Sequence, residues 1–251
     1  MNPSPTTAIV SACLLAAVWV GIWLRHFLPD HHLSPDSRDT VKLAMGLVAT
    51  MSAVLLGLLV SSAKISYETT HAQVMQRAAK FALLDRLLVI YGPAATVVRG
   101  QLHDLVAEAT QRMWPDESAI LAPPKPGSGL GNAFYASLLR LEARDDTELT
   151  LKAQAVSLAL ELGQLQSLML AESSPSISKP MLVVVVVWLV MIFLGFSLLT
   201  PPNVTSMSAL IVSALCVAGA IFLILELDQP FGGFMRISSE PMLNVLHELG
   251  N

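Results

Sequence analysis

The chain has 251 residues, of which 53% are hydrophobic and 14% charged, and its formal net charge at pH 7 is −4. A typical soluble domain is about 25% charged, so this composition excludes a disordered chain, a nucleic-acid-binding protein that relies on positive charge, and an ordinary soluble enzyme. Because 11 of the 15 Lys and Arg and 12 of the 19 Asp and Glu fall between residues 64 and 180, the sequence predicts a membrane protein with one large polar insert.

Four apolar stretches are long enough to cross a bilayer as helices, which takes about 20 residues. We interpret the first as a retained helix rather than a signal peptide, because no Lys or Arg precedes it. The run from 181 to 225 has no charge over 45 residues, and Pro201 and Pro202 divide it into two spans. The four predicted spans are residues 7–24, 43–63, 181–199 and 204–225.

The loop RHFLPDHHLSPD, residues 25–36, follows the first span and contains groups that can bind metal ions. They are His26, Asp30, His31, His32 and Asp36. Adjacent His side chains rarely converge on one ion, and no further ligand is fixed by spacing. We therefore predict no metal site and interpret the segment as a solvated loop; a metal or proton-sensing site is the alternative.

The second span carries a stripe of small and hydroxyl-bearing residues. Gly46, Thr50, Ala53, Gly57 and Ser61 are spaced 4, 3, 4 and 4 apart and so share one helix face. Such a stripe lets two helix backbones approach closely, or it lines a water-filled axis, and both interpretations stay open. No span has a charge in its interior, which argues against a proton pump or a carboxylate-coupled antiporter.

The insert is predicted to be helical. Val74, Ala78, Phe81, Leu84, Leu88 and Tyr91 recur at helical spacing up to Gly92-Pro93, and a second helix should end near Trp114. After a loop that includes residues 123–129, the last helix carries two apolar rows, which predicts contacts with more than one neighbour, in the same subunit or another. The rows are Leu151, Ala155, Leu158, Leu162, Leu165 and Met169, and Leu149, Ala153, Val156 and Leu160.

Two acidic residues, Glu226 and Asp228, end the fourth span, where carboxylates oppose the helix dipole. Solvation, or pairing with Arg236 or a cation of the insert, would explain them. The alternative is a cation-attracting ring at a pore mouth, formed when subunits assemble around an axis.

Motifs of enzyme chemistry are missing from the sequence. It has no Gly-rich phosphate loop and no HExxH, CxxC or GxSxG, and no nucleophile and base lie together near a span. We therefore predict a protein that is not an enzyme and needs no cofactor.

Three segments together resemble a bacterial membrane family catalogued as a bestrophin-like domain of unknown function. They are KLAMGLVATMSAVLLGLLVSSAKISYE (42–68), LLDRLLVIYGP (83–93) and LELDQPFGGFMRISSEP (225–241). The resemblance implies four membrane helices with helical cytoplasmic extensions and kinship with bestrophins, which are homopentameric ion channels whose second span lines the pore.

Two details of the bestrophin pattern can be compared with this sequence. Gln229-Pro230-Phe231-Gly232 looks like the Asn-Pro-Phe-Gly motif that leads into the acidic calcium clasp of bestrophins, but no carboxylate follows until Glu240, so the clasp is not reproduced. Bestrophins narrow their neck with bulky apolar side chains, including Phe. The second span here contains no Phe, so Leu55, Leu58 or Leu59 would have to form the constriction.

The expected protein is an all-α membrane protein of the bestrophin-like type, with a long helical cytoplasmic insert between the second and third of four transmembrane helices. Its expected parts are 1–63 (spans 1 and 2), 64–180 (insert), 181–228 (spans 3 and 4) and 229–251 (C-terminal segment).

We expect a homo-oligomeric ion channel, a pentamer by resemblance, with the second span around the pore. Its partners would be the lipid bilayer, its own copies and inorganic ions, with no nucleic acid. The alternative is a membrane-anchored scaffold or stress-response protein whose insert docks a cytoplasmic partner. The resemblance implies a bacterial inner-membrane protein, and cations near the helix ends favour an orientation with both termini and the insert in the cytoplasm. On that side lie Lys64, Arg77, Lys80, Lys179 and Arg236, and opposite them Arg25, Arg38 and Lys42.

Overall fold

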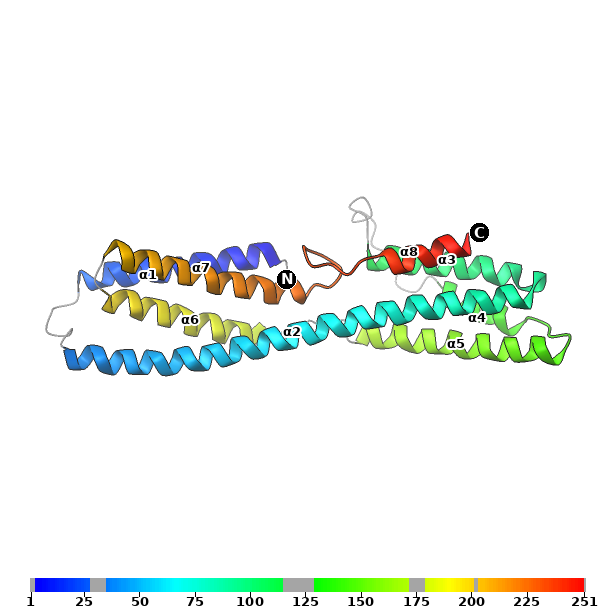
Figure 1. Cartoon of the computed structure of the whole chain (residues 1–251), viewed down its shortest axis with the longest axis horizontal. Helices are drawn as coiled ribbons and strands as arrows, with labels where there is room; N and C mark the ends of the chain where they lie inside the picture. The colour runs from blue at the N-terminus through cyan, green and yellow to red at the C-terminus, as the bar shows by residue number, and fades with distance from the viewer. Residues whose placement is uncertain (1–2, 28–34, 115–128, 172–178, 201–202, 251) are drawn as a thin grey trace. The chain divides into compact units, whose positions relative to one another are not determined.

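The computed structural model describes residues 3–27, 35–114, 129–171, 179–200 and 203–250. Within these ranges the chain is helical and contains no strand, which confirms the predicted all-α class (Figure 1). Its helices are α1 (Pro3–Arg25), α2 (Pro35–Tyr91), the short 3₁₀ helix η2 (Pro93–Ala95), α3 (Thr96–Met113), α4 (Leu130–Leu139), α5 (Asp146–Ala171), α6 (Lys179–Leu199), α7 (Val204–Leu227) and α8 (Glu240–Leu249). The predicted loop at 123–129 lies, except for Gly129, outside the described residues.

The chain divides into two compact units. Unit 1 comprises Met1–Tyr67, Pro175–Gln229 and Gly233–Met235, and unit 2 comprises Glu68–Ser174, Pro230–Gly232 and Arg236–Asn251. Helix α2 contributes to both, because it continues without a break past residue 63, where the second span was expected to end. Its 57 residues make a helix about 86 Å long, so only part of α2 can lie in a hydrocarbon core about 30 Å thick.

Unit 1 contains helices that are long and apolar enough to cross a membrane: α1, α6, α7 and the N-terminal part of α2. Of the most apolar 18 residues in each helix, 44% are buried in α6, 28% in α1 and in α7, and 11% in α2. The core of this unit therefore forms mainly among α1, α6 and α7. Helix α2 adds only one edge to it, chiefly Leu59 and Ala63.

Close backbone approach joins α1 to α6. A Cβ atom built on Gly21 would lie 2.6 Å from the Leu194 carbonyl oxygen and 1.8 Å from Ser197 Oγ, so only glycine fits there. Lipid tails are as apolar as leucine, so helices in a bilayer gain their attraction from such close packing rather than from the hydrophobic effect. The Arg25 guanidinium adds a polar contact by donating to the Thr200 carbonyl, close to the C-terminus of α6, where cations are favoured.

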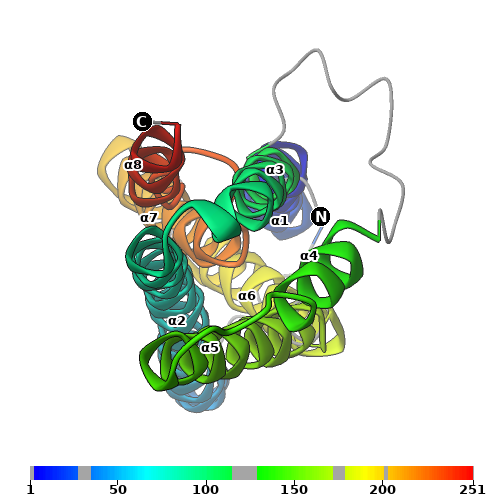
Figure 2. The same ribbon diagram turned by 90° about the vertical axis from the view of Figure 1, so that its right-hand side faces the viewer.

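Unit 2 is a helical bundle built on the C-terminal part of α2 (Figure 2). The apolar face predicted for this part is confirmed, since each of its residues is at most 6% exposed: Val74, Ala78, Phe81, Leu84, Leu88 and Tyr91. Leu102 and Val106 of α3 are fully buried as well. Helix α2 ends at Tyr91, and Gly92 directly after it has a φ of 96°, a conformation that residues with side chains disfavour.

Charged side chains stabilise unit 2 in two further places, between α2 and α3 and at the start of α5. Asp85, on the buried side of α2, accepts hydrogen bonds from Arg99 Nε at 2.5 Å and Arg99 Nη2 at 3.3 Å. The hydrogen bond to Asp85 raises the pKa of Arg99. At the start of α5, Asp145 Oδ1 accepts from the Glu148 amide at 2.6 Å, and Glu148 Oε2 accepts from the Arg144 amide at 2.7 Å. This reciprocal capping satisfies amide donors that a helix start leaves without partners.

Replacing Gly21 with alanine should destabilise unit 1 by about 1–3 kcal/mol, because the new Cβ collides with the backbone of α6. The matched control is Gly219→Ala on α7, where a Cβ meets no atom within 4 Å. Thermal unfolding of the purified protein in detergent measures both changes. Equal melting temperatures for the two variants would contradict the close approach of α1 and α6.

Candidate functional site

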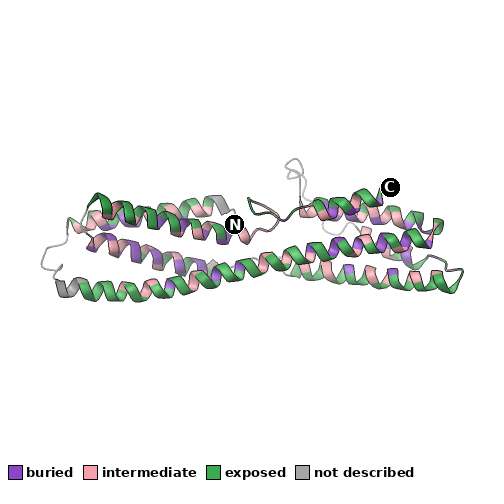
Figure 3. Cartoon of the chain, viewed as in Figure 1, coloured by how far each residue is buried: buried purple, intermediate pink, exposed green. Residues whose placement is uncertain are grey.

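The small-residue stripe of α2 lies on an exposed side of the helix. Gly46, Thr50, Ala53, Gly57 and Ser61 are all exposed, and at 3.6 residues per turn they cover about 80° of arc. A Cβ atom built on Gly46 or Gly57 meets no atom within 4 Å. Exposed residues predominate along this part of α2 (Figure 3). The stripe therefore faces away from the core of unit 1.

The three leucines considered for a constriction lie in different environments. Leu59 is 2% exposed and belongs to the core, and Leu55 is half-buried against that core. Leu58 is 55% exposed. Leu58 is therefore the one of the three whose side chain is open to a partner outside its own subunit.

The exposed face of α2 is weakly polar and carries no charge between Lys42 and Lys64. The Thr50 hydroxyl donates to the Leu47 carbonyl at 2.8 Å. Because a hydroxyl that donates one hydrogen bond can still accept another, its oxygen remains able to bind a water molecule or an ion. Lys64 is exposed and continues the stripe three residues after Ser61. Chemically, the face offers space, one or two hydroxyl oxygens and a cation at one end.

Glu226, one residue before the end of α7, is 2% exposed. Its Oε2 accepts a hydrogen bond from the Phe234 amide at 2.8 Å, a charge-assisted contact that closes the reversal after α7. Gly233 permits this turn, because its φ is +75° and a Cβ there would lie 2.2 Å from Glu226 Oε2. The backbone thus holds this carboxylate, and among the described residues no ion pair joins it to Arg236.

Asp228 and Gln229 follow at the C-terminal end of α7, and both are half-buried. The Asp228 amide donates to the Ile224 carbonyl at 3.2 Å, and the Gln229 amide donates to the Glu226 carbonyl at 3.1 Å. The α7 backbone therefore continues its last turn through these residues, and Asp228 is the residue directly after the helix.

The next residues of the motif are anchored within unit 2 by a tryptophan that the sequence analysis did not select as a site residue. Trp114 Nε1 donates to the Ile237 carbonyl at 2.8 Å, and its ring meets the Phe231 ring edge-on with centroids 5.6 Å apart. The Ile237 amide in turn donates to the Pro230 carbonyl at 2.7 Å. Pro230, Phe231 and Gly232 are half-buried. The only sequence signal for Trp114 is its place at a helix end directly before Pro115.

Other polar residues of the sequence analysis are also placed. Residues 28–34 of the His-rich loop lie outside the described part of the chain. His26 is exposed, with Nδ1 3.0 Å from the Ile22 carbonyl oxygen. Among the counted cations, Lys80 pairs with Glu161 at 2.5 Å, and Arg77 is buried in unit 2.

Comparison with known proteins identifies the type of fold. A family model described as a Bestrophin-like domain matches residues 12–242. Crystal structures of a bacterial bestrophin homolog from Klebsiella pneumoniae superpose on this chain: one point mutant gives a TM-score of 0.68 with 14% sequence identity and covers 97% of each chain. A second mutant gives 0.67 with 14% identity and 100% coverage of both chains. A structure phased with zinc gives 0.66 with 15% identity, covering 97% of this chain and 95% of the other. No curated protein sequence matches.

Alanine at position 233 should weaken the turn after α7 by about 1–3 kcal/mol, since it combines an unfavourable positive φ with a collision against the Glu226 carboxylate. The control is Gly100→Ala, in an open position of helix α3, where alanine is expected to be neutral or stabilising by up to about 1 kcal/mol. Thermal unfolding separates them. If Gly233→Ala melts no lower than Gly100→Ala, Glu226 does not organise this turn.

Proposed function

The chain belongs to the Bestrophin-like family, and we propose that it forms a homo-oligomeric ion channel in the bacterial inner membrane, with the N-terminal part of α2 around the pore. The observation that carries this proposal is the exposed stripe of α2. Its small residues lie opposite the buried edge at Leu59 and Ala63, so α2 packs on its own subunit with one face and presents the other outward.

An ion pathway is the better explanation of the stripe than packing of α2 on lipid alone. Glycine and hydroxyl residues leave room for water and offer oxygen ligands to ions, whereas a lipid-facing helix gains nothing from them. Large apolar side chains flank the stripe on one side, and they would pack against the next α2 in a ring: Leu47 and Val54, both exposed. We propose Leu58 as the narrowing residue, because Leu55 and Leu59 face the core of their own subunit. A pentamer is proposed from the family resemblance.

Two charges mark the proposed pathway. Lys64 continues the stripe, so assembled subunits would place a ring of lysines at one end of the charge-free segment. Asp228, the residue directly after α7, is the acid proposed for a pore mouth, because it is half-buried whereas Glu226 is only 2% exposed. Both termini and unit 2 are proposed to lie in the cytoplasm. In this proposal the protein is not an enzyme and binds no cofactor to conduct.

Flux measurements on purified protein in proteoliposomes test the channel directly. Replacing Gly57 with leucine should lower ion flux by at least about tenfold, because five or so added side chains would fill a narrow pore. Gly219→Leu on α7, another open glycine, should leave flux within about twofold. Cross-linking checks that both variants keep the oligomeric state of the unmodified protein.

The outcomes of that experiment differ clearly. Loss of flux with the oligomer intact supports pore lining, whereas loss of the oligomer with Gly57→Leu means that the stripe packs one helix against another. No flux above empty vesicles for the unmodified protein, across several anions and cations and at varied pH and calcium, would contradict the channel.

Neutralising each of the two charges should shift ion selectivity in opposite directions. Asp228→Asn should lower the permeability of cations relative to anions, and Lys64→Gln should raise it, because a ring of charge attracts counterions to a pore. Reversal potentials under a salt gradient across a planar bilayer measure both. An unchanged value for one variant removes that residue from the pathway.

A membrane-anchored scaffold is the second candidate function. The observation in its favour is a set of exposed leucines on α5, which its own subunit leaves uncovered: Leu149, Leu160, Leu168 and Leu170. Cross-linking of the detergent-solubilised protein separates the two candidates. A stoichiometric partner of another kind favours the scaffold, and a closed ring of identical subunits favours the channel.

A further inference from the structure

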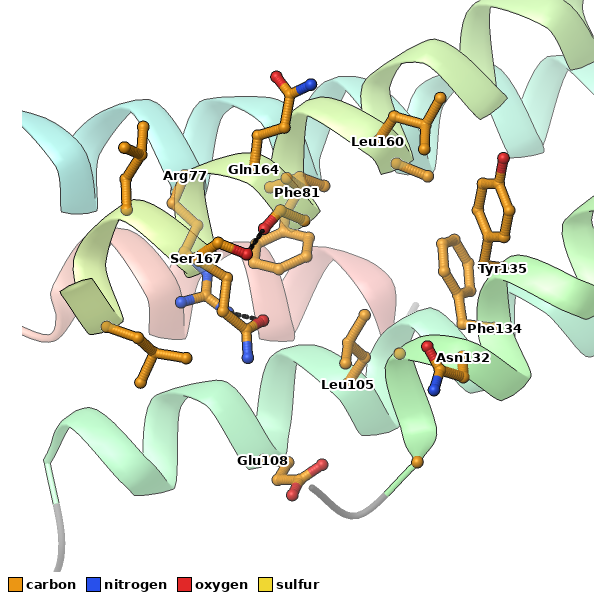
Figure 4. Close-up of a pocket in the computed structure, with 18 of the residues that line it drawn as sticks. Arg77, Phe81, Leu105, Glu108, Asn132, Phe134, Tyr135, Leu160, Gln164 and Ser167 are labelled. Carbon is orange, nitrogen blue, oxygen red and sulfur yellow. Dashed lines mark hydrogen bonds between the residues drawn. The ribbon is translucent and has the colours of Figure 1, made fainter. Parts of the chain in front are cut away.

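Unit 2 contains a half-open cavity of about 970 Å³. It is lined by residues of α2, α3, α4 and α5 and lies within this one unit (Figure 4). This volume is in the range of pockets that hold small organic molecules, roughly 300–1,000 Å³. The proposed ion pathway uses none of the residues that line it.

Arg77 of α2 projects into this cavity (Figure 4). Its side chain is only 7% exposed, and its Nε has no hydrogen-bond partner among the described residues. Two uncharged groups contact the guanidinium: Gln166 Oε1, which accepts from Nη2 at a long 3.4 Å, and the Phe81 ring, whose centroid is 5.5 Å from Cζ. No carboxylate of the described residues forms an ion pair with it.

A buried guanidinium without a counterion is unfavourable, because removing a charge from water costs several kcal/mol unless a partner offsets it. Among the described residues, the other charged groups that line the cavity do not provide one. Glu108 forms an ion pair with Arg112 one turn further along α3. Burial, together with the charge of Arg112, lowers the pKa of Arg77 to about 10, so Arg77 remains cationic at neutral pH.

Among the residues that the structure describes, the charges that line the cavity are two arginines and one glutamate, an excess of one positive charge. A ligand with one negative charge neutralises it. A dianion such as hydrogen phosphate (HPO₄²⁻) would leave an uncompensated negative charge beside apolar walls, which is unfavourable. A carboxylate matches the flat guanidinium, which donates two parallel hydrogen bonds to such a group.

The remaining wall suits an apolar body. Phe81 and Phe134 are buried aromatic residues, and Leu105 and Leu160 bring aliphatic surface from α3 and α5 (Figure 4). Polar side chains such as Asn132 and Gln164 complete the lining. Apolar walls with a few polar groups that orient the ligand are typical of small-molecule sites.

We propose that the cavity of unit 2 is a binding site for an amphipathic monocarboxylate, with its carboxylate on Arg77 and its apolar body between Phe81, Phe134 and Leu160. Such a ligand is either a fatty acid from the membrane or a water-soluble aryl or alkyl acid. The site is separate from the ion pathway, so its test is a binding measurement and does not depend on conduction.

Isothermal titration calorimetry of the full-length protein in lipid nanodiscs tests the site, with empty nanodiscs subtracted. The probes are decanoate for the fatty acid, 4-phenylbutyrate for the water-soluble acid, and the neutral amide of each. Saturable binding of at least one acid, at least about tenfold tighter than its amide, is the expected result, because the amide lacks the charge that pairs with Arg77. Equal titration by acid and amide, or no binding of either acid, overturns the proposal.

Variants locate the binding. Arg77→Gln should weaken acid binding by at least about tenfold, whereas Arg86→Gln, which changes an exposed arginine of the same helix, should leave it unchanged. Leu160→Trp keeps Arg77 and fills part of the cavity from a residue that is 50% exposed, so it should also abolish binding, and it provides the test if Arg77→Gln does not fold. Acid binding that survives in folded Arg77→Gln or Leu160→Trp protein overturns the assignment.

Discussion

The bilayer imposes the constraint on which this structure depends. In its hydrocarbon interior the hydrophobic effect does not drive helices together, so their association depends on close packing of their surfaces. Helices α1 and α6 meet this requirement at Gly21, where the backbone of one helix touches the other. Helix α2 does not meet it along its stripe, where a Cβ on Gly46 or Gly57 would touch nothing. The open face of small residues on α2 leaves room for a partner outside its own subunit, and the assembly around an axis that we propose would cover it.

Polar groups follow a second rule, that buried charge is held by specific partners. Glu226 satisfies it with the Phe234 amide, and Asp85 satisfies it with Arg99. Arg77 has neutral contacts only among the described residues. The contrast separates structural charges, which organise a turn or a helix pair, from the one charge that we assign to a ligand.

Periodicity in the sequence predicted the long elements well, because both spans and amphipathic helices bury residues at fixed spacing. The face from Val74 to Tyr91 is buried as predicted. Helices α4 and α8 were not predicted, since each has only 10 residues, too few turns for a clear pattern. The environments of Glu226 and Arg77 could not be predicted either. Their partners are set by tertiary structure: a backbone amide eight residues away for Glu226, and Gln166 on another helix for Arg77.

The absence of charge inside all four predicted spans has a consequence for how such a protein could respond to its surroundings. Moving one elementary charge through a membrane potential of 100 mV does about 2.3 kcal/mol of work. When helices without such charges tilt or rotate in the bilayer, the membrane potential does almost no work on them. A pore made of them would therefore be nearly insensitive to voltage.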